Sequence, residues 1–201
     1  MVVINSFAER TIIFALEESE NYPYYTGYGK TLNCDKPGVS IELLKIVEEE
    51  LGIDIEFRRE PWKRVIDDLE KGKIDGAFNA SFKQERTKMG VYPKKDGNVD
   101  ESKRITTLSY CLYKRKDSDL DWNGGEFINL KGALGAPLGY SIVSDLEKMG
   151  VKVETSKSTF TDMKKLKYRR IEGVAALEQD TDMVIKNNKE YQDIVKVSPP
   201  I

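Results

Sequence analysis

Runs of apolar residues and regular apolar spacings alternate along the chain, and together they predict an α/β protein. Short apolar runs predict strands covered on both faces at 11–16, 133–136 and 173–177. Apolar residues spaced three or four positions apart predict helices between the strands, most clearly at 40–51 and 62–70. Strands that alternate with helices in this way are typical of mainly parallel sheets with helices on their faces.

The ends of the predicted helices carry recognisable signals. Gly52, Gly72 and Gly150 each follow the last apolar position of a helix, where only glycine adopts a left-handed conformation without a steric penalty. Ser40 is the expected N-cap of the first helix. Pro61 is expected to open the second helix.

Two segments, beginning at Gly52 and Gly150, follow the same order of residue types. Each runs through a strand, an aromatic residue, a helix, and an acidic residue followed by glycine before the next strand. Any two strand–helix–strand units share part of this order, but agreement at all of these points makes chance a weaker explanation. We therefore expect two α/β lobes of similar construction whose strand ends face one another across a cleft.

The remaining segments are expected to connect and complete these lobes. Residues 91–101 and 117–130 are polar and predict irregular loops. Residues 105–113 mix polar and apolar side chains, as an extended connection between lobes would. A last helix is predicted at 181–187 and a last strand at 194–197.

The stretch 71–86 holds the strongest candidate for ligand recognition. A short apolar run predicts a buried strand, and the polar Asn79, Ser81 and Lys83 follow where that strand ends. In open α/β sheets, ligands bind at this carboxyl end of the strands. Arg86 comes next, and its guanidinium can bind an anion in a bidentate geometry, although a single arginine is most often exposed to solvent.

A loop rich in tyrosine, proline and glycine follows the first predicted strand, at 17–30. Loops after strands often carry binding residues, and tyrosine combines an apolar face with a polar tip. Covering the surface of the domain is at least as common a role for any single tyrosine. The tyrosines that are candidates to line a pocket are Tyr22, Tyr24, Tyr25 and Tyr28.

Composition and charge exclude several classes of protein. Lys+Arg is 32 and Asp+Glu is 34, so the net charge of -2 argues against a nucleic-acid binder, which concentrates positive charge on one face. No apolar run approaches the ~18 residues of a membrane span. The N-terminus lacks the basic and apolar regions of a signal peptide, so we expect either a cytosolic protein or one whose leader has been removed.

The chain has no histidine and two cysteines, Cys34 and Cys111. Zinc sites usually need several Cys or His ligands, so we expect no metal and no cofactor. Without histidine, an enzyme would have to use carboxylates such as Glu17 or Glu178, or Lys83, and catalysis is therefore the least favoured function. The cysteines are compatible with one disulfide of an exported protein or with two free thiols.

Several motifs, taken in order, resemble the family-3 extracellular (periplasmic) solute-binding proteins of the amino-acid ABC transporter type. The motifs are YPYY, PWKRVIDDLEKGKIDGAF, the ER pair that ends at Arg86, and LGAPLGYS. The resemblance extends from about residue 11 to the C-terminus. It implies a type II periplasmic-binding fold, in which two α/β lobes hold a ligand in the cleft between them.

The resemblance also implies roles for individual residues. Arg86 would bind a ligand carboxylate, helped by residues just before it and by N–H groups and a hydroxyl at a helix N-terminus of the second lobe, because helix N-termini attract anions. The tyrosines would pack on the ligand's side chain, and Trp62 would shape the wall. The expected ligand-binding residues are Asn79, Ser81, Lys83, Arg86, Gly139, Tyr140, Ser141, Tyr22, Tyr24, Tyr25, Trp62 and Glu178.

Three features depart from the family pattern. Leu177 stands where amino-acid binders have an aspartate for the ligand's ammonium, and Glu178 beside it is the only substitute in that position, although a shift of one residue on a strand reverses the side chain's direction. Lys83 replaces a position that is commonly hydroxylic and adds positive charge. The sequence also ends soon after the expected crossing back to the first lobe, where family members usually continue with a strand and a helix.

These observations predict a first lobe over 1–105, to which 192–201 return, and a second lobe over 106–191. We expect a monomer that closes on a small anionic or zwitterionic solute, an amino acid or a related compound, in the periplasm or outside the cell. Its partner would be the permease of an ABC transporter, and nucleic acid is not an expected partner. The alternative is an extracellular ligand-sensing domain of a signalling receptor with the same fold.

Overall fold

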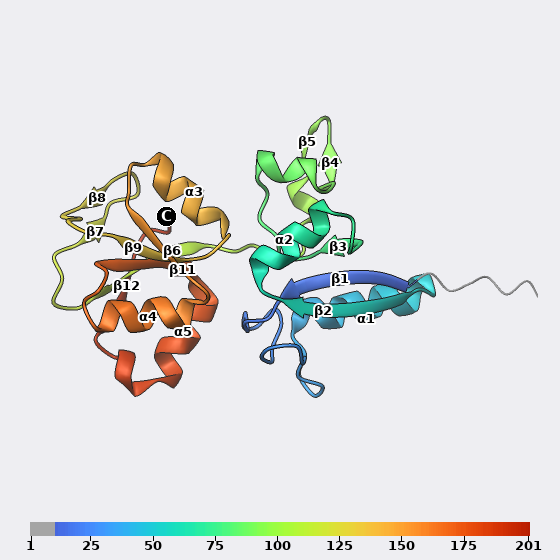
Figure 1. The fold of residues 1–201 in the computed structure, drawn as a ribbon, viewed down its shortest axis with the longest axis horizontal. Helices are drawn as coiled ribbons and strands as arrows, with labels where there is room; N and C mark the ends of the chain where they lie inside the picture. Colours follow the sequence, from blue (N-terminus) through green and yellow to red (C-terminus); the bar gives the residue numbers. More distant parts are fainter. Residues whose placement is uncertain (1–10) are drawn as a thin grey trace, which may run out of the picture.

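Two α/β lobes make up the computed structural model, which describes residues 11–201 (Figure 1). The first lobe is coloured blue to green and the second yellow to red. The first lobe is built on a three-stranded sheet in the order β2-β1-β3, and both pairings are parallel. Its strands are β1 (Thr11–Glu17), β2 (Asp54–Glu60) and β3 (Gly76–Ala77).

Alternation along β1 buries this sheet on both faces. Phe14 and Leu16 pack with helix α1 (Val39–Leu51), whereas Ile13 and Ala15 pack with helix α2 (Trp62–Glu70). Because successive side chains of a strand point to opposite faces, the continuous apolar run predicted from the sequence supplies both layers. This strand and both helices are confirmed, with their ends within one residue of the predicted ones.

The N-terminus of α1 differs from the expectation that Ser40 caps it. The N-cap is Gly38, and Ser40 lies inside the first turn, where its hydroxyl donates a hydrogen bond of 3.1 Å to Asn79 Oδ1. The first N–H groups of a helix need acceptors from outside it. Here the carbonyls of Pro23 and Tyr24 accept from the N–H groups of Val39 and Ser40, both at 3.0 Å. The tyrosine-rich loop therefore takes the place of a capping side chain.

The second lobe is built on a five-stranded sheet in the order β10-β9-β11-β6-β12. Strands β9, β10 and β11 are parallel to one another, while β6 is antiparallel to both of its neighbours. The sheet is therefore mixed rather than mainly parallel. Its strands are β6 (Tyr110–Arg115), β9 (Leu134–Pro137), β10 (Val153–Ser156), β11 (Gly173–Leu177) and β12 (Ile194–Val197).

Helices cover both faces of this second sheet. Two apolar clusters form its core, one around Tyr113 and Met163 and the other around Leu134 and Leu146. The first cluster lies under the fourth helix and the second under the third, which is consistent with their positions on opposite sides of the sheet (Figure 1). The helices are α3 (Ser141–Lys148), α4 (Thr159–Lys167) and α5 (Glu178–Asn187).

The expected return of 192–201 to the first lobe is not observed. Strand β12 pairs with β6 in the second sheet, and the N–H of Ile201 donates to the carbonyl oxygen of Tyr110 at 2.8 Å. Pairing between segments so far apart along the chain leaves no local signal in a sequence. Residues 104–109 connect the lobes, and the boundary between residues 105 and 106 remains a proposal.

Short elements occupy the stretches predicted to be irregular. The loops at 91–101 and 117–130 each contain a two-stranded hairpin, and strand structure in the connection expected at 105–113 begins only at residue 110. No helix within 11–201 has the length and apolar character needed to cross a membrane. The short elements are β4 (Lys94–Lys95), β5 (Asn98–Val99), β7 (Asp121–Trp122), β8 (Phe127–Ile128), η1 (Gln84–Lys88), η2 (Glu101–Lys103) and η3 (Lys189–Tyr191).

The two cysteines are free thiols in the structure. Cys34 lies exposed in the tyrosine-rich loop, and Cys111 is buried in the second lobe. Of the two alternatives left open by the sequence, the structure therefore has the unpaired one.

Candidate ligand-binding cleft

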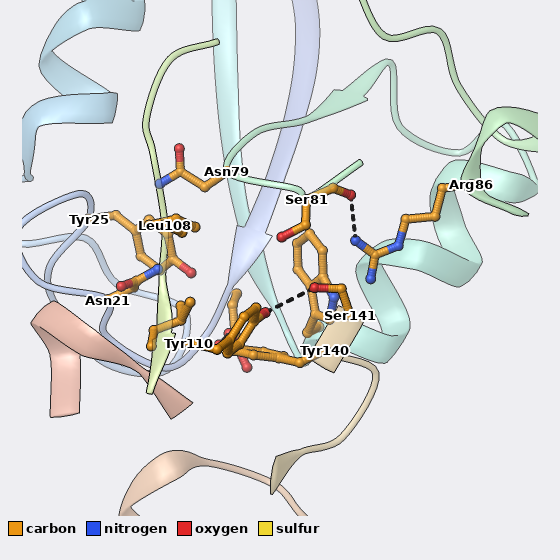
Figure 2. A pocket seen from close by; sticks show the side chains of 12 residues that line it. Asn21, Tyr25, Asn79, Ser81, Arg86, Leu108, Tyr110, Tyr140 and Ser141 are labelled. Atoms are coloured by element: carbon orange, nitrogen blue, oxygen red, sulfur yellow. Dashed lines mark hydrogen bonds between the residues drawn. The ribbon is translucent and has the colours of Figure 1, made fainter. Parts of the chain in front are cut away.

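A narrow cleft lies between the lobes, where the ends of β1 and β3 meet the beginnings of β6 and α3 (Figure 2). Both lobes contribute side chains to it, and the space left between them is about 20 Å³, room for about one water molecule. The side chains that line the cleft are Glu17, Asn21, Tyr25, Trp62, Asn79, Ser81, Arg86, Leu108, Tyr110, Tyr140, Ser141 and Leu177.

Arg86 projects from η1 into this cleft and is buried. Its Nη1 donates to the carbonyl oxygen of Ser81 at 2.9 Å, and its Nη2 donates to the carbonyl oxygen of Gly139 at 3.0 Å. The guanidinium carbon also lies 5.7 Å from the ring centroid of Trp62, within the range of a cation–π contact. No carboxylate among the described residues pairs with this guanidinium, so a buried cation is held by neutral groups alone.

Residues that precede Arg86 in the chain also line the cleft. Asn79 has a positive φ of 57°, which few residues other than glycine adopt and which is often found at functional sites. Its Oδ1 accepts from Ser40, and its buried Nδ2 has no partner among the described residues. In Figure 2 Asn79 lies on the side of Tyr25 and Leu108, away from Arg86, so this free donor belongs to a different part of the cleft.

The second lobe contributes the turn into α3. Tyr140 is the N-cap of this helix, and Ser141 Oγ donates to the hydroxyl of Tyr110 at 3.2 Å (Figure 2). Gly139 has a φ of 80°, a conformation that favours glycine, and its carbonyl faces the first lobe, where it accepts from Arg86 and Trp62. This segment therefore supplies polar groups to the cleft and holds the lobes together.

Glu17 and Asn21 belong to the cleft although neither was expected to bind a ligand. Glu17 ends β1, is 4% exposed, and accepts a hydrogen bond from the Tyr140 hydroxyl of the second lobe. Burial raises the pKa of Glu17 to about 7, and the nearby carboxylate of Asp180 adds to this effect. An acidic residue directly after a buried apolar strand is the signal that would have identified Glu17, because that position is the carboxyl end of the strand.

Asn21 follows in the tyrosine-rich loop and is also 4% exposed. Its side-chain Oδ1 is buried and has no hydrogen-bond partner among the described residues. Nearby, buried Arg59 donates to the carbonyls of Glu18, Thr26 and Gly27 at 2.7 to 2.8 Å and so holds this loop against β2. No pattern in the sequence singled out either Asn21 or Arg59.

Some of the expected ligand-binding residues do not line the cleft. Tyr22 is 42% exposed, and the Tyr24 hydroxyl donates to the carbonyl of Thr107 at 3.4 Å. Glu178 is the first residue of α5, where its carboxylate accepts from Lys196 at 2.7 Å. The strand ends at Leu177, so Glu178 is directed away from the cleft while Leu177 lines it.

Lys83 also has a partner of its own, Asp145 of α3, and this ion pair joins the two lobes. The lobes are joined at three further points, namely Arg86 to Gly139, Trp62 to Gly139, and Tyr140 to Glu17. These contacts hold the lobes close together around the cleft. A solute as large as an amino acid fits only if the lobes move apart.

A second, larger cavity of about 670 Å³ lies beside β3 in the first lobe. It shares Asn79, Ser81, Arg86 and Leu108 with the cleft, and all of its lining residues come from the first lobe and the connection to β6. The cleft is the stronger candidate for a solute site, because polar groups from both lobes converge only there.

Two lobes joined by a short connection, with a buried cation between them, are the arrangement expected of a two-lobe binding protein. Comparison with protein families supports this class, because residues 19–197 match the bacterial extracellular solute-binding proteins, family 3. The match covers most of the chain, and the protein therefore belongs to this family. A search of curated proteins gave no match.

Solved structures show the same fold. A histidine kinase sensor domain with similarity to periplasmic binding proteins has a TM-score of 0.76 and 16% identity, over 96% of this chain and 78% of that one. The arginine-bound form of truncated ArgBP from T. maritima has a TM-score of 0.70 and 16% identity, over 95% and 83%. A substrate-binding protein of an amino acid ABC transporter also reaches 0.70 at 16% identity, over 94% and 78%. The expected periplasmic-binding-protein-like fold is confirmed.

Proposed function

We propose that this protein binds a small carboxylate-bearing solute, an amino acid or a related compound, in the cleft between its lobes. The observation that carries the proposal is the buried guanidinium of Arg86, which interacts with carbonyl oxygens, the ring of Trp62 and the Tyr92 hydroxyl but with no carboxylate among residues 11–201. A buried charge without a counter-ion is costly, and a ligand carboxylate would supply one in a bidentate geometry. The hydroxyl of Ser141, which donates to Tyr110 in the structure, would donate to the same anion instead.

Binding requires the lobes to separate and close again. The Gly139 carbonyl occupies one side of the guanidinium, so a carboxylate would displace it as the lobes part about residues 104–109. Closure would then exclude water from the charged contacts, and hydrogen bonds to charged groups are typically worth about 1.5–3 kcal/mol. Hinge closure of this kind is a common design for two-lobe binders.

The first test replaces the anchor. The twenty L-amino acids are first screened for those that raise the melting temperature of the wild type. Arg86→Ala is expected to abolish that stabilisation, because the ligand carboxylate loses its counter-ion. Arg58→Ala removes the same side chain from an exposed site on β2 and serves as the matched control. An unchanged dissociation constant in Arg86→Ala, measured by calorimetry, would contradict the proposal.

The proposed physiological role rests on membership of the family rather than on the geometry of the cleft. We propose delivery of the solute to the permease of an ABC transporter, in the periplasm or outside the cell, without chemical conversion. Native mass spectrometry of freshly purified protein would identify a solute carried through purification. Recovery of that solute unchanged after prolonged incubation is the expected result, and a converted product would indicate an enzyme.

A sensing role is the second candidate, and likeness to a histidine kinase sensor domain favours it. The two roles differ in the partner that responds to the closed lobes. Ligand-dependent stimulation of ATP hydrolysis by a reconstituted transporter would support uptake. A signalling segment encoded in the same polypeptide would support sensing.

A further inference from the structure

The larger cavity of the first lobe, beside β3, has no role in the proposed solute site. Its volume of about 670 Å³ lies within the range of about 300–1,000 Å³ that is usual for pockets that hold small molecules. The space left in the cleft between the lobes is only about 20 Å³. Of these two spaces, the cavity is the one that can accept a small molecule without movement of the lobes.

Apolar side chains from several elements form much of the cavity wall. Ile66 and Leu69 come from α2, and Phe14 comes from β1. The elements α2, β3 and β5, which all border the cavity, lie together above β1 in Figure 1. Exposed apolar residues that gather around one cavity are a mark of a binding site, whereas isolated ones need no explanation. The exposed apolar residues of this wall are Phe82 at 41%, Val91 at 96% and Ile105 at 45%.

Charged groups around the cavity balance one another. Arg104 and Glu101 form an ion pair at 3.3 Å. A lining without net charge gives an ion little electrostatic advantage, and mainly apolar walls favour apolar ligands. The cavity therefore fits an uncharged, mainly apolar molecule. The three acidic and three basic residues that line it are Asp75, Asp100, Glu101, Arg86, Lys103 and Arg104.

An added polypeptide strand is the weaker candidate for this cavity. Among the described strands, β3 lies at the edge of its sheet, and edge strands can pair with a strand of another chain. Strand addition depends on a row of main-chain hydrogen bonds, and β3 has only two residues, Gly76 and Ala77. A compact apolar molecule needs no such row.

The cavity and the cleft share a wall that contains Arg86. The Ser81 carbonyl in this wall accepts from Arg86 Nη1 at 2.9 Å and from the Tyr92 hydroxyl at 3.0 Å. Tyr92 lines the cavity and packs edge-to-face on Phe82, with ring centroids 5.2 Å apart. A molecule in the cavity would therefore restrain the ring whose hydroxyl fixes the carbonyl beside Arg86. The residues that line both spaces are Asn79, Ser81, Arg86 and Leu108.

We propose that the cavity beside β3 binds an uncharged, mainly apolar small molecule, and that this molecule raises the affinity of the cleft for its solute. The second part rests on the proposed carboxylate site at Arg86, whereas the first part does not. An occupied cavity restrains Tyr92 and Ser81, so less freedom is lost when the solute binds Arg86. By thermodynamic reciprocity, the solute raises the affinity of the cavity by the same factor.

The neutral fluorescent probe N-phenyl-1-naphthylamine tests the cavity, because its emission rises in an apolar site. We expect saturable binding of one probe molecule per protein. Gly90→Leu should weaken this binding at least about tenfold by filling the cavity. A Cβ at Gly90 meets only Leu69, at 3.7 Å, so the new side chain does not strain the backbone. Gly125→Leu adds the same side chain to a loop of the second lobe and, as the matched control, should bind like the wild type.

Phe82→Ala is a second variant, which removes part of the cavity wall at a partly exposed position and should also weaken probe binding. Thermal unfolding shows that each variant is folded. Absence of probe binding to the wild type, or wild-type affinity in both Gly90→Leu and Phe82→Ala, would overturn the site. Displacement of the probe by an L-amino acid would place it in the cleft, and loss of probe binding as dimers form in sedimentation would assign the cavity to a second copy. Either result would also overturn the site.

Calorimetry tests the coupling with the L-amino acid that most stabilises the wild type, measured with and without saturating probe. We expect about fivefold tighter binding of the amino acid in the presence of the probe. Tyr92→Phe keeps the ring but removes the hydroxyl that donates to Ser81, so it should bind the probe normally and show no such increase. An unchanged dissociation constant in the wild type would overturn the coupling alone. If no L-amino acid binds the wild type, the proposed function and the coupling both fail, while the probe still decides the cavity site.

Discussion

Single buried carboxyl groups dominate the chemistry of this protein at the residue scale. Burial raises the pKa of Glu17 and that of Asp180 to about 7, and the charge of Asp180 adds to the effect on Glu17. Asp162 in α4 has both carboxylate oxygens buried with no hydrogen-bond partner among residues 11–201, and burial raises its pKa to about 6 although Lys165 lies 3.9 Å away. Each of these groups holds its proton more tightly in the folded than in the unfolded chain.

These raised pKa values determine how the free energy of unfolding depends on pH. Between about pH 4.5 and 7 the folded state binds more protons than the unfolded state, so the free energy of unfolding should fall as pH rises through this window. Glu17→Gln removes one such group and is expected to gain stability relative to wild type between pH 5 and 8, by on the order of 3 kcal/mol. Urea unfolding at several pH values measures this, with Glu18→Gln as the control, and a pH-independent difference between variant and wild type would contradict it.

At the scale of a single element, the junction between the tyrosine-rich loop and α1 is tightly constrained. Gly38 has a φ of 104°, and a Cβ built on it would lie 2.5 Å from the carbonyl oxygen of Tyr24. That carbonyl accepts from the Ser40 N–H, and the Ser40 hydroxyl in turn donates to Asn79 in the cleft. One glycine therefore positions the helix, the loop and a wall of the cleft.

Gly38→Ala is expected to be destabilising by about 2 kcal/mol or more, since the new methyl group meets backbone and the conformation is strained for alanine. Gly52→Ala is the matched control, because Gly52 is also left-handed, at a φ of 60°, but a Cβ there meets no atom within 4 Å. Its expected cost is only that of the backbone conformation, about 1 kcal/mol. Equal losses in thermal unfolding for the two variants would contradict the proposed clash.

At the scale of the whole molecule, the contacts between the two lobes determine how close together the lobes lie. Within residues 11–201, four hydrogen bonds or ion pairs of side chains join the lobes, and the one between opposite charges links Lys83 to Asp145. The Lys83 side chain is 15% exposed and that of Asp145 is 39% exposed, so solvent screens the pair in part. Pairs of this kind contribute at most about 1 kcal/mol, which corresponds to about a fivefold change in the ratio of closed to open lobes.

Lys83→Ala is expected to shift the molecule toward separated lobes, because it removes this ion pair. Small-angle X-ray scattering should then give a larger radius of gyration for the variant than for the wild type. The charge swap Lys83→Asp with Asp145→Lys should restore most of the wild-type value. Lys71→Ala, which breaks an ion pair within α2 and its C-terminal turn, is the control, and an unchanged radius for Lys83→Ala would contradict a role in closure.

Local patterns were enough to predict most of the helices and strands and about half of the residues that line the candidate cleft. The apolar runs at β1 and β11 and the spacing of α1 and α2 are properties of neighbouring residues, so they can be recognised without knowing the fold. The same holds for Arg86, because a polar stretch after a buried strand marks the end of a sheet where ligands bind.

Contacts between residues far apart in the chain determined the features that local patterns did not predict. Strand β12 lies in the second sheet because it pairs with β6. The spacing of apolar residues along the chain gives no information about such a pairing. Glu178 binds Lys196 because α5 begins at Glu178 and directs its side chain away from the cleft. Asn21 lines the cleft because Arg59 and the N-terminus of α1 hold its loop in place. The sequence alone specified a two-lobe α/β protein and the arginine for which we propose anion binding, and the packing of distant segments brought Glu17 and Asn21 into the same cleft.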